Sequence, residues 1–180
     1  MKAILREIAL TLILAIVIFF LLQTTVQSFI IVGSSMQPNF QEGERLLINK
    51  VVYKFRQPER GEVIIFHLPS GQQADYIKRV IGLPGDSIEV KDGAVYVNGS
   101  KLDEPYIRDS PRYTFHLLVV LDNEYFVLGD NRNNSNDSHN GWTVPRKNII
   151  GKAWLLIWPP GEWRLVPHYS LEGQLASPTE

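Results

Sequence analysis

The sequence of 180 residues contains no cysteine. Disulfide bonds, a cysteine nucleophile and a thiolate metal site are therefore excluded. A basic block is also missing, because 18 lysines and arginines are balanced by 19 aspartates and glutamates, with a formal net charge of −1. We therefore expect no nucleic acid partner. The sequence has no internal repeat, and 44% of its residues are hydrophobic, which is enough for one domain with a core.

Charge is absent from residue 8 to residue 41. The apolar part of this stretch, Ile8 to Val26, would span roughly 28 Å as a helix, close to the ~30 Å of a bilayer's hydrocarbon core. We predict a transmembrane anchor over residues 8–27. A cleaved signal peptide is one alternative, but the run is long and "TTVQSF" lacks an A-x-A site. A buried core helix is another, but a polar face is missing.

The orientation of the anchor follows from Lys2 and Arg6, which precede it. The positive-inside rule assigns this end, residues 1–7, to the cytoplasm. Residues 28–170 are then expected to form an extracytoplasmic domain, followed by a loose tail over residues 171–180.

The rest of the chain has the pattern of short strands separated by glycine- and proline-containing turns. This pattern predicts a mainly β fold, a barrel-like structure or sandwich of antiparallel strands, after one N-terminal transmembrane helix. A hairpin is expected to turn at Asp92-Gly93, within residues 86–102, and residues 110–123 are ambiguous. The other expected strands lie in residues 44–55, 61–68, 74–86, 124–131, 149–158 and 162–166.

Three segments could carry chemistry. The first offers a serine and the second a lysine. "GSSMQP" (33–38) has two serines, which most often mark a flexible turn and become nucleophilic only beside a base. "ADYIKRVIGLPGD" (74–86) places Lys78 on a strand among apolar residues. Such a lysine is usually an ion-paired or snorkelling residue. Burial can also lower its pKa until the neutral amine accepts a serine proton.

The third segment is "GDNRNNSNDSHNGW" (129–142), whose composition is typical of a hydrogen-bonded loop. A calcium loop starting at Asp130 would need Asp or Asn at its third position and Gly at its sixth, where this sequence has Arg132 and Ser135. We therefore expect no metal. A Ser-His-Asp triad is disfavoured because His139 directly follows Asp137-Ser138, and such neighbours usually point apart.

Together these segments resemble the bacterial type I signal peptidases, or leader peptidases, which are membrane-anchored Ser/Lys proteases. The resemblance covers roughly residues 1–165, in the compact form without a large accessory domain. Its four blocks follow the anchor in the family's order: Ser35-Met36-Gln37-Pro38, Arg60-Gly61-Glu62-Val63, Tyr76 to Asp86, and Gly129 to Ser138.

The resemblance implies that Ser35 is the nucleophile and Lys78 the general base. It implies that Ser135 hydrogen-bonds and orients the lysine amine. Arg79, Asp130, Arg132 and Asp137 would hold the site together, with Arg79 paired to Asp130.

The resemblance also implies a substrate, a secretory preprotein cleaved after small residues at −1 and −3. The preprotein would bind as an added strand against residues 30–33 and 75–78. No cofactor is implied, and the partners would be preproteins and the lipid bilayer. The enzyme would lie in the bacterial plasma membrane or an internal membrane such as a thylakoid, and we expect a monomer. The substrate pockets would be lined by Phe29, Ile31, Met36, Tyr76 and Ile77.

The sequence departs from the family pattern at two positions. Gly33 stands where some members have a serine that assists the oxyanion hole, so the hole would depend on backbone N–H groups such as that of Ser35. His139 stands where the family often has arginine. The rival interpretations are another Ser/Lys peptidase, of the self-cleaving repressor or conjugation type, and a membrane-tethered β-domain that binds partners without catalysis.

Overall fold

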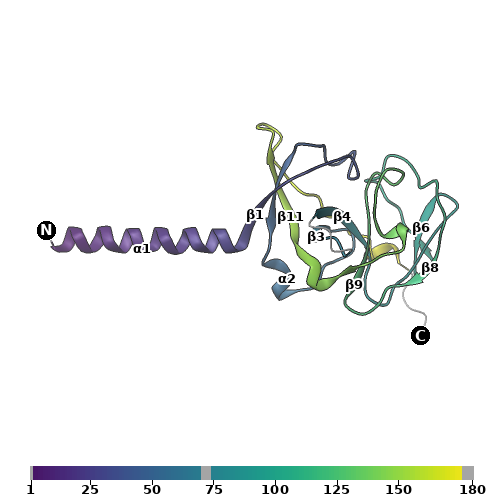
Figure 1. Ribbon diagram of the computed structural model, residues 1–180, viewed down its shortest axis with the longest axis horizontal. Helices are drawn as coiled ribbons and strands as arrows, with labels where there is room; N and C mark the ends of the chain where they lie inside the picture. The colour runs from purple at the N-terminus through teal and green to yellow at the C-terminus, as the bar shows by residue number, and fades with distance from the viewer. Residues whose placement is uncertain (1, 70–73, 176–180) are drawn as a thin grey trace.

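The computed structural model describes residues 2–69 and 74–175. Its longest element is helix α1 (Lys2–Thr25), which projects away from a β-rich domain (Figure 1). The helix is long and apolar enough to cross a membrane, and the domain buries none of its most apolar stretch. Strand β1 begins at Val26, so the helix ends two residues before the end of the predicted anchor.

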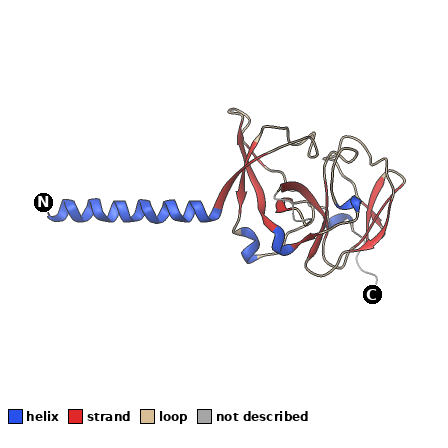
Figure 2. Ribbon diagram, in the orientation of Figure 1, coloured by secondary structure: helices blue, strands red, loops and turns tan. Residues whose placement is uncertain are grey.

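The domain consists almost entirely of strands and loops (Figure 2). Its larger sheet contains eight strands, and all of their pairings are antiparallel. In spatial order these are β1 (Val26–Ile30), β2 (Arg45–Asn49), β11 (Ile149–Trp158), β3 (Val63–His67), β4 (Asp75–Gly82), β9 (Glu124–Leu128) and β10 (Val144–Pro145), with β12 (Arg164–Leu165) paired to β11.

A smaller sheet lies at the end of the domain away from α1 (Figure 1). Its hairpin turns at Asp92 and Gly93, both with positive φ, as a two-residue turn between twisted strands requires. The predicted hairpin is therefore confirmed. In spatial order the strands are β7 (Ser100–Lys101), β6 (Ala94–Val97), β5 (Ser87–Lys91) and β8 (Phe115–Val119).

Three apolar clusters form the core and fix the relative positions of the strands. One joins the smaller sheet to β4 and β9 through residues such as Ile81, Ile88 and Phe126. Another packs the chain that follows β1 against β2 and β11, with Ile31 and Met36 buried in it. The predicted mainly β fold with one apolar N-terminal helix is thus confirmed.

The expected strand over residues 44–55 is only half correct. The side-chain oxygen of Asn49 accepts hydrogen bonds from the backbone N–H groups of Val51 and Val52. This local turn ends β2, and the chain continues as the helical turn α2 (Val52–Phe55).

The segment 110–123, which the sequence left ambiguous, contains β8. The described residues also include three short 3₁₀ turns: η1 (Ser138–Asn140), η2 (Arg146–Asn148) and η3 (Glu172–Gln174).

The tail is better anchored than predicted. Leu171 is buried in the core cluster of the smaller sheet. Gln174 accepts a hydrogen bond from the backbone of Asp103 and donates another to it. The rest of the predicted loose tail, residues 176–180, lies outside the described residues.

Candidate active site

The loop that follows β1 carries Ser35 to the segment 129–138. The backbone N–H of Asn131 donates to the Ser35 carbonyl at 3.0 Å, and its side chain donates to the Ser34 carbonyl at 3.1 Å. Gly129 permits this approach, because a side chain at that position would collide with the Ser35 carbonyl and with Ser135. Two segments nearly 100 residues apart are therefore joined beside the end of β4.

Lys78 reaches this loop from β4. Its Nζ donates to Ser35 Oγ at 2.6 Å and to the Ile77 carbonyl at 2.9 Å. The residue is only 3% exposed. Burial lowers the pKa of the Lys78 amine to about 8, although the nearby charges of Asp137 and Asp130 oppose the change. The amine is thus in contact with a serine hydroxyl and is easier to deprotonate than an ordinary lysine.

Ser135 does not make the predicted hydrogen bond to Lys78. Its Oγ is buried and has no hydrogen-bond partner in the described part of the chain. The hydroxyl lies close to Gly129, on the loop that contacts Ser35. The structure orients the lysine amine through Ser35 and the Ile77 carbonyl instead.

The expected pair of Arg79 and Asp130 is present and fully buried. The guanidinium donates twice to the carboxylate, at 2.8 and 2.7 Å, and once to the Gly61 carbonyl at 2.8 Å. It also lies over the ring of Tyr106, 4.2 Å from the ring centre. This two-bond geometry joins β4 to the end of β9 directly behind Lys78.

Arg132 pairs with Glu104, a residue that the sequence analysis missed. The two side chains are buried and make two hydrogen bonds, at 2.6 and 2.7 Å. Arg132 also donates to the Gly129 carbonyl at 3.0 Å. Glu104 lies in "LDEPY", which has no strand or helix periodicity, so no local signal distinguishes it.

Asp137 contacts His139, contrary to the expectation that these neighbours point apart. One carboxylate oxygen lies 2.7 Å from His139 Nδ1, and the other accepts from the backbone N–H of Gly129 at 2.9 Å. Asp137 caps the 3₁₀ turn η1, and this bends the chain back toward its side chain. Ser138 is buried and its Oγ accepts from the backbone of Val127, so these residues do not form a triad.

A groove of ≈ 680 Å³ opens beside the Ser35–Lys78 pair. Phe29, Tyr76 and Ile77, three of the residues predicted to contact the substrate, line it. Ile31 and Met36 do not, because they are only 2% and 1% exposed within the core. Ile30, Val32 and Asp75 also line it, and they belong to the segments 30–33 and 75–78 that were predicted to pair with the substrate. Ala74, Asn134 and Asn136 line it as well and were not predicted.

Unpaired strand edges border this groove. Residues 75–78 of β4 pair with β3 on one side, and pairing with β9 begins only at Arg79. On the opposite wall, β1 pairs with β2 alone within the described residues. Free backbone N–H and C=O groups of two strands are therefore available to an extended peptide.

One cluster outside the groove has the composition of a metal site. It consists of Glu59, Glu62 and His168. The carboxylate of Glu62 already accepts from Arg56, Lys152 and Tyr53. These donors occupy the Glu62 oxygens that a metal would need, so Glu62 belongs to an ion-pair network with Arg56 and Lys152.

Residues 4–158 match the family described as "Signal peptidase, peptidase S26". The chain belongs to this family. It is therefore a serine peptidase, as the resemblance to the family implied. It is 43% identical over 159 residues to "Probable signal peptidase I-2" of a Synechocystis strain, covering 85% of this chain and 73% of that one.

Further relatives of the chain come from other bacteria. It is 36% identical to "Signal peptidase IB" of Staphylococcus aureus over 183 aligned residues, covering 91% of this chain and 95% of that one. The crystal structure of a signal peptidase I from Enterococcus faecalis matches with 32% identity and a TM-score of 0.45. That match covers 54% of this chain and 97% of the other.

Proposed function

We propose that the protein removes N-terminal signal peptides from exported preproteins, with Ser35 as the nucleophile and Lys78 as the general base. The observation that carries this proposal is the 2.6 Å contact between Lys78 Nζ and Ser35 Oγ. Burial lowers the pKa of that amine to about 8, and a base near neutral pH suits proton transfer. Membership of the signal peptidase family supports the choice of substrate.

The proposed reaction begins with neutral Lys78. Its amine accepts the Ser35 proton while Ser35 Oγ forms a bond to the scissile carbonyl carbon. Backbone N–H groups, including that of Ser35, stabilise the oxyanion, since Gly33 offers no hydroxyl. The lysine ammonium then protonates the leaving amine as the peptide C–N bond breaks. Lys78 next accepts a proton from the water that attacks the acyl-enzyme, and it passes this proton to Ser35 Oγ as the ester C–O bond breaks and the new carboxyl terminus leaves.

The groove supports an extended substrate. The free edge of β4 at residues 75–78 and the edge of β1 would each hydrogen-bond its backbone. The apolar walls formed by Phe29 and Ile77 suit small apolar side chains at positions −1 and −3. Cleavage after such residues is therefore part of the proposal.

The position of Ser35 also supports a substrate held in the membrane. It lies ten residues after Thr25, the last residue of α1, so the nucleophile stays near the membrane surface. With Lys2 and Arg6 in the cytoplasm, the catalytic domain would lie outside. There it would meet exported preproteins as their cleavage sites emerge.

The test is cleavage of a preprotein by the purified full chain. Ser35→Ala and Lys78→Ala should each lower kcat/KM at least ~100-fold, the lower end of the contribution of a positioned base. Lys78→Arg should be equally inactive, because arginine does not deprotonate. Circular dichroism should show unchanged secondary structure in each variant.

Ser34→Ala is the matched control. Ser34 Oγ accepts a hydrogen bond from Asn134 at 2.9 Å, whereas Lys78 donates to Ser35. Because Ser34 does not contact the proposed base, this variant should keep most of its activity. Normal cleavage by Ser35→Ala, or an inactive Ser34→Ala, would show that the nucleophile is wrongly assigned. A wild-type protein that cleaves no preprotein would favour the rival interpretation, a tethered binding domain.

A further inference from the structure

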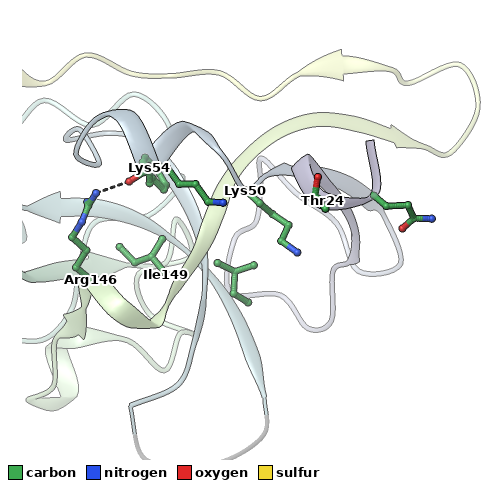
Figure 3. A pocket seen from close by; sticks show the side chains of 8 residues that line it. Thr24, Lys50, Lys54, Arg146 and Ile149 are labelled. Atoms are coloured by element: carbon green, nitrogen blue, oxygen red, sulfur yellow. Dashed lines mark hydrogen bonds between the residues drawn. The ribbon is translucent and has the colours of Figure 1, made fainter. Parts of the chain in front are cut away.

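A second pocket lies where α1 meets the domain (Figure 3). Its volume is ≈ 510 Å³, and it shares no lining residue with the groove beside Ser35. The last turn of α1 forms one side, and β11 and the region around α2 form the others. The lining residues are Gln23, Thr24, Lys50, Tyr53, Lys54, Arg146, Ile149 and Ile150.

The pocket is strongly basic in a chain whose net charge is −1. Three of its eight lining residues are cations, and none is acidic. Figure 3 shows Lys54 between Arg146 and Lys50, and Lys50 between Lys54 and Thr24 at the end of α1. In the described ranges, no carboxylate lies within ion-pair distance of Lys50 or Lys54. Glu62, whose carboxylate bonds to the pocket residue Tyr53, already pairs with Arg56 and Lys152 and does not pair with the pocket lysines.

Arg146 fixes the position of one wall of the pocket by hydrogen bonding. Its Nη2 donates to the carbonyl oxygens of Tyr53 and Arg56, at 2.6 and 3.1 Å. These bonds join α2, which carries Lys54, to the turn η2 just before β11. Arg146 thus adds a fixed positive charge, while the ammonium groups of Lys50 and Lys54 stay available to a ligand.

The depth of the pocket is set by α1. Gln23 and Thr24 are the first polar residues after a long apolar run, so this turn lies where the helix leaves the hydrocarbon. The backbone N–H of Lys50 donates to the Thr25 carbonyl at 2.9 Å and holds the pocket at that level. Next to Lys54, the side chain of Phe55 is 85% exposed. Exposed phenylalanines and lysines occur together on segments that lie in the membrane interface.

We propose that this pocket binds the phosphate of an anionic phospholipid headgroup. Lys50 and Lys54 would donate to the phosphate oxygens, and Ile149 and Ile150 would contact the glycerol and the first acyl carbons. The lipid is favoured over free phosphate because the pocket has an apolar wall and lies at headgroup depth. The proposal depends on the position of α1 in a membrane and not on the catalytic assignment.

The test measures lipid binding to the full chain in a neutral detergent. Dioleoyl phosphatidylglycerol and dioleoyl phosphatidylcholine are each titrated, and the melting temperature reports binding to the folded state. Phosphatidylglycerol should raise the melting temperature of the wild type at lower concentration than phosphatidylcholine does. In the variant Lys50→Gln/Lys54→Gln its apparent affinity should fall about 25-fold, since each basic residue near an anionic surface contributes roughly a fivefold factor.

The matched control is Lys91→Gln/Lys101→Gln, which removes the same charge from two exposed lysines of the smaller sheet. It should bind phosphatidylglycerol like the wild type. Equal affinities in the pocket variant and the wild type, or no preference for phosphatidylglycerol, would overturn the proposal. Inorganic phosphate that raises the melting temperature as effectively as the lipid would overturn the assignment to a headgroup.

Discussion

The proposed chemistry of the protein centres on one buried amine. Lys78 is only 3% exposed, and burial lowers its pKa to about 8. The carboxylates of Asp137 and Asp130 act in the opposite direction by favouring the ammonium. At neutral pH a minority of molecules therefore carries the free amine that the proposed mechanism needs.

Activity should depend on pH with a midpoint near the pKa of Lys78. The neutral fraction falls tenfold for each pH unit below about 8, so kcat/KM for a preprotein should fall in proportion on the acidic side and level off above the midpoint. Initial rates of the purified full chain over this range provide the measurement. A profile that stays flat down to pH 5, or one with its midpoint at the ordinary lysine pKa, would argue against a desolvated base.

Lys78→Met should make the protein more stable while abolishing catalysis. The lowered pKa means that the unfolded chain binds more protons than the folded one between about pH 8 and pH 10.5. The free energy of unfolding of the wild type should thus rise with pH across this window. Below about pH 8 the ammonium is buried in the folded state and destabilises it by a constant amount. Removing the amine should increase the free energy of unfolding at pH 7 by about 1–3 kcal/mol.

Urea denaturation at pH 7 and pH 10.5 measures this effect. The stabilisation should be smaller at the higher pH, where the wild-type amine is already neutral. A variant less stable than the wild type at pH 7 would mean that the two hydrogen bonds of Lys78 outweigh its desolvation.

Among the elements, those specified by local sequence could be predicted. The β5–β6 hairpin follows from Asp92-Gly93, because only a few residue pairs tolerate positive φ at both turn positions. Strand β11 coincides with the predicted strand 149–158, in which Lys152 is the one charged residue. In contrast, α2 depends on two hydrogen bonds to the side chain of Asn49, and the strand pattern of residues 44–55 conceals them.

The parts of the site that depend on distant partners could not be predicted in the same way. The resemblance to a family suggested Ser35, Lys78 and the Arg79–Asp130 pair. It did not suggest Glu104, because an ion pair across 28 residues leaves no periodic pattern. The packing of Ser135 near Gly129, in place of a bond to Lys78, likewise follows from the tertiary contact with the Ser35 loop.

The joint between β4 and β9 should depend strongly on Arg79. Arg79→Leu leaves the fully buried carboxylate of Asp130 without its cation, which should cost about 3–5 kcal/mol in the free energy of unfolding. The matched control is Arg108→Leu, which breaks an exposed pair with Asp109 and should change stability by less than about 1 kcal/mol. Chemical denaturation measures both, and similar small losses would mean that the buried pair does not brace the site.

At the scale of the whole molecule, the proposed topology can be tested because the chain has no cysteine. Single cysteines can be introduced as Ala3→Cys, at the start of α1, and Lys91→Cys, at an exposed site on β5. The measurement uses intact cells in which a maleimide that does not cross the membrane can reach its outer surface. The maleimide should label only the Lys91→Cys protein. Ala3→Cys should react after lysis. The reverse pattern would place the domain in the cytoplasm.

The junction between α1 and β1 also has a mechanical consequence. No linker separates Thr25 from Val26, and the backbone of Lys50, just after β2, is hydrogen-bonded to the last turn of the helix. The helix and the sheet therefore turn together. Spanning helices change their tilt when bilayer thickness changes. In this protein such a change would also rotate the groove relative to the membrane, so the lipid composition would help determine the angle at which a membrane-held substrate meets Ser35.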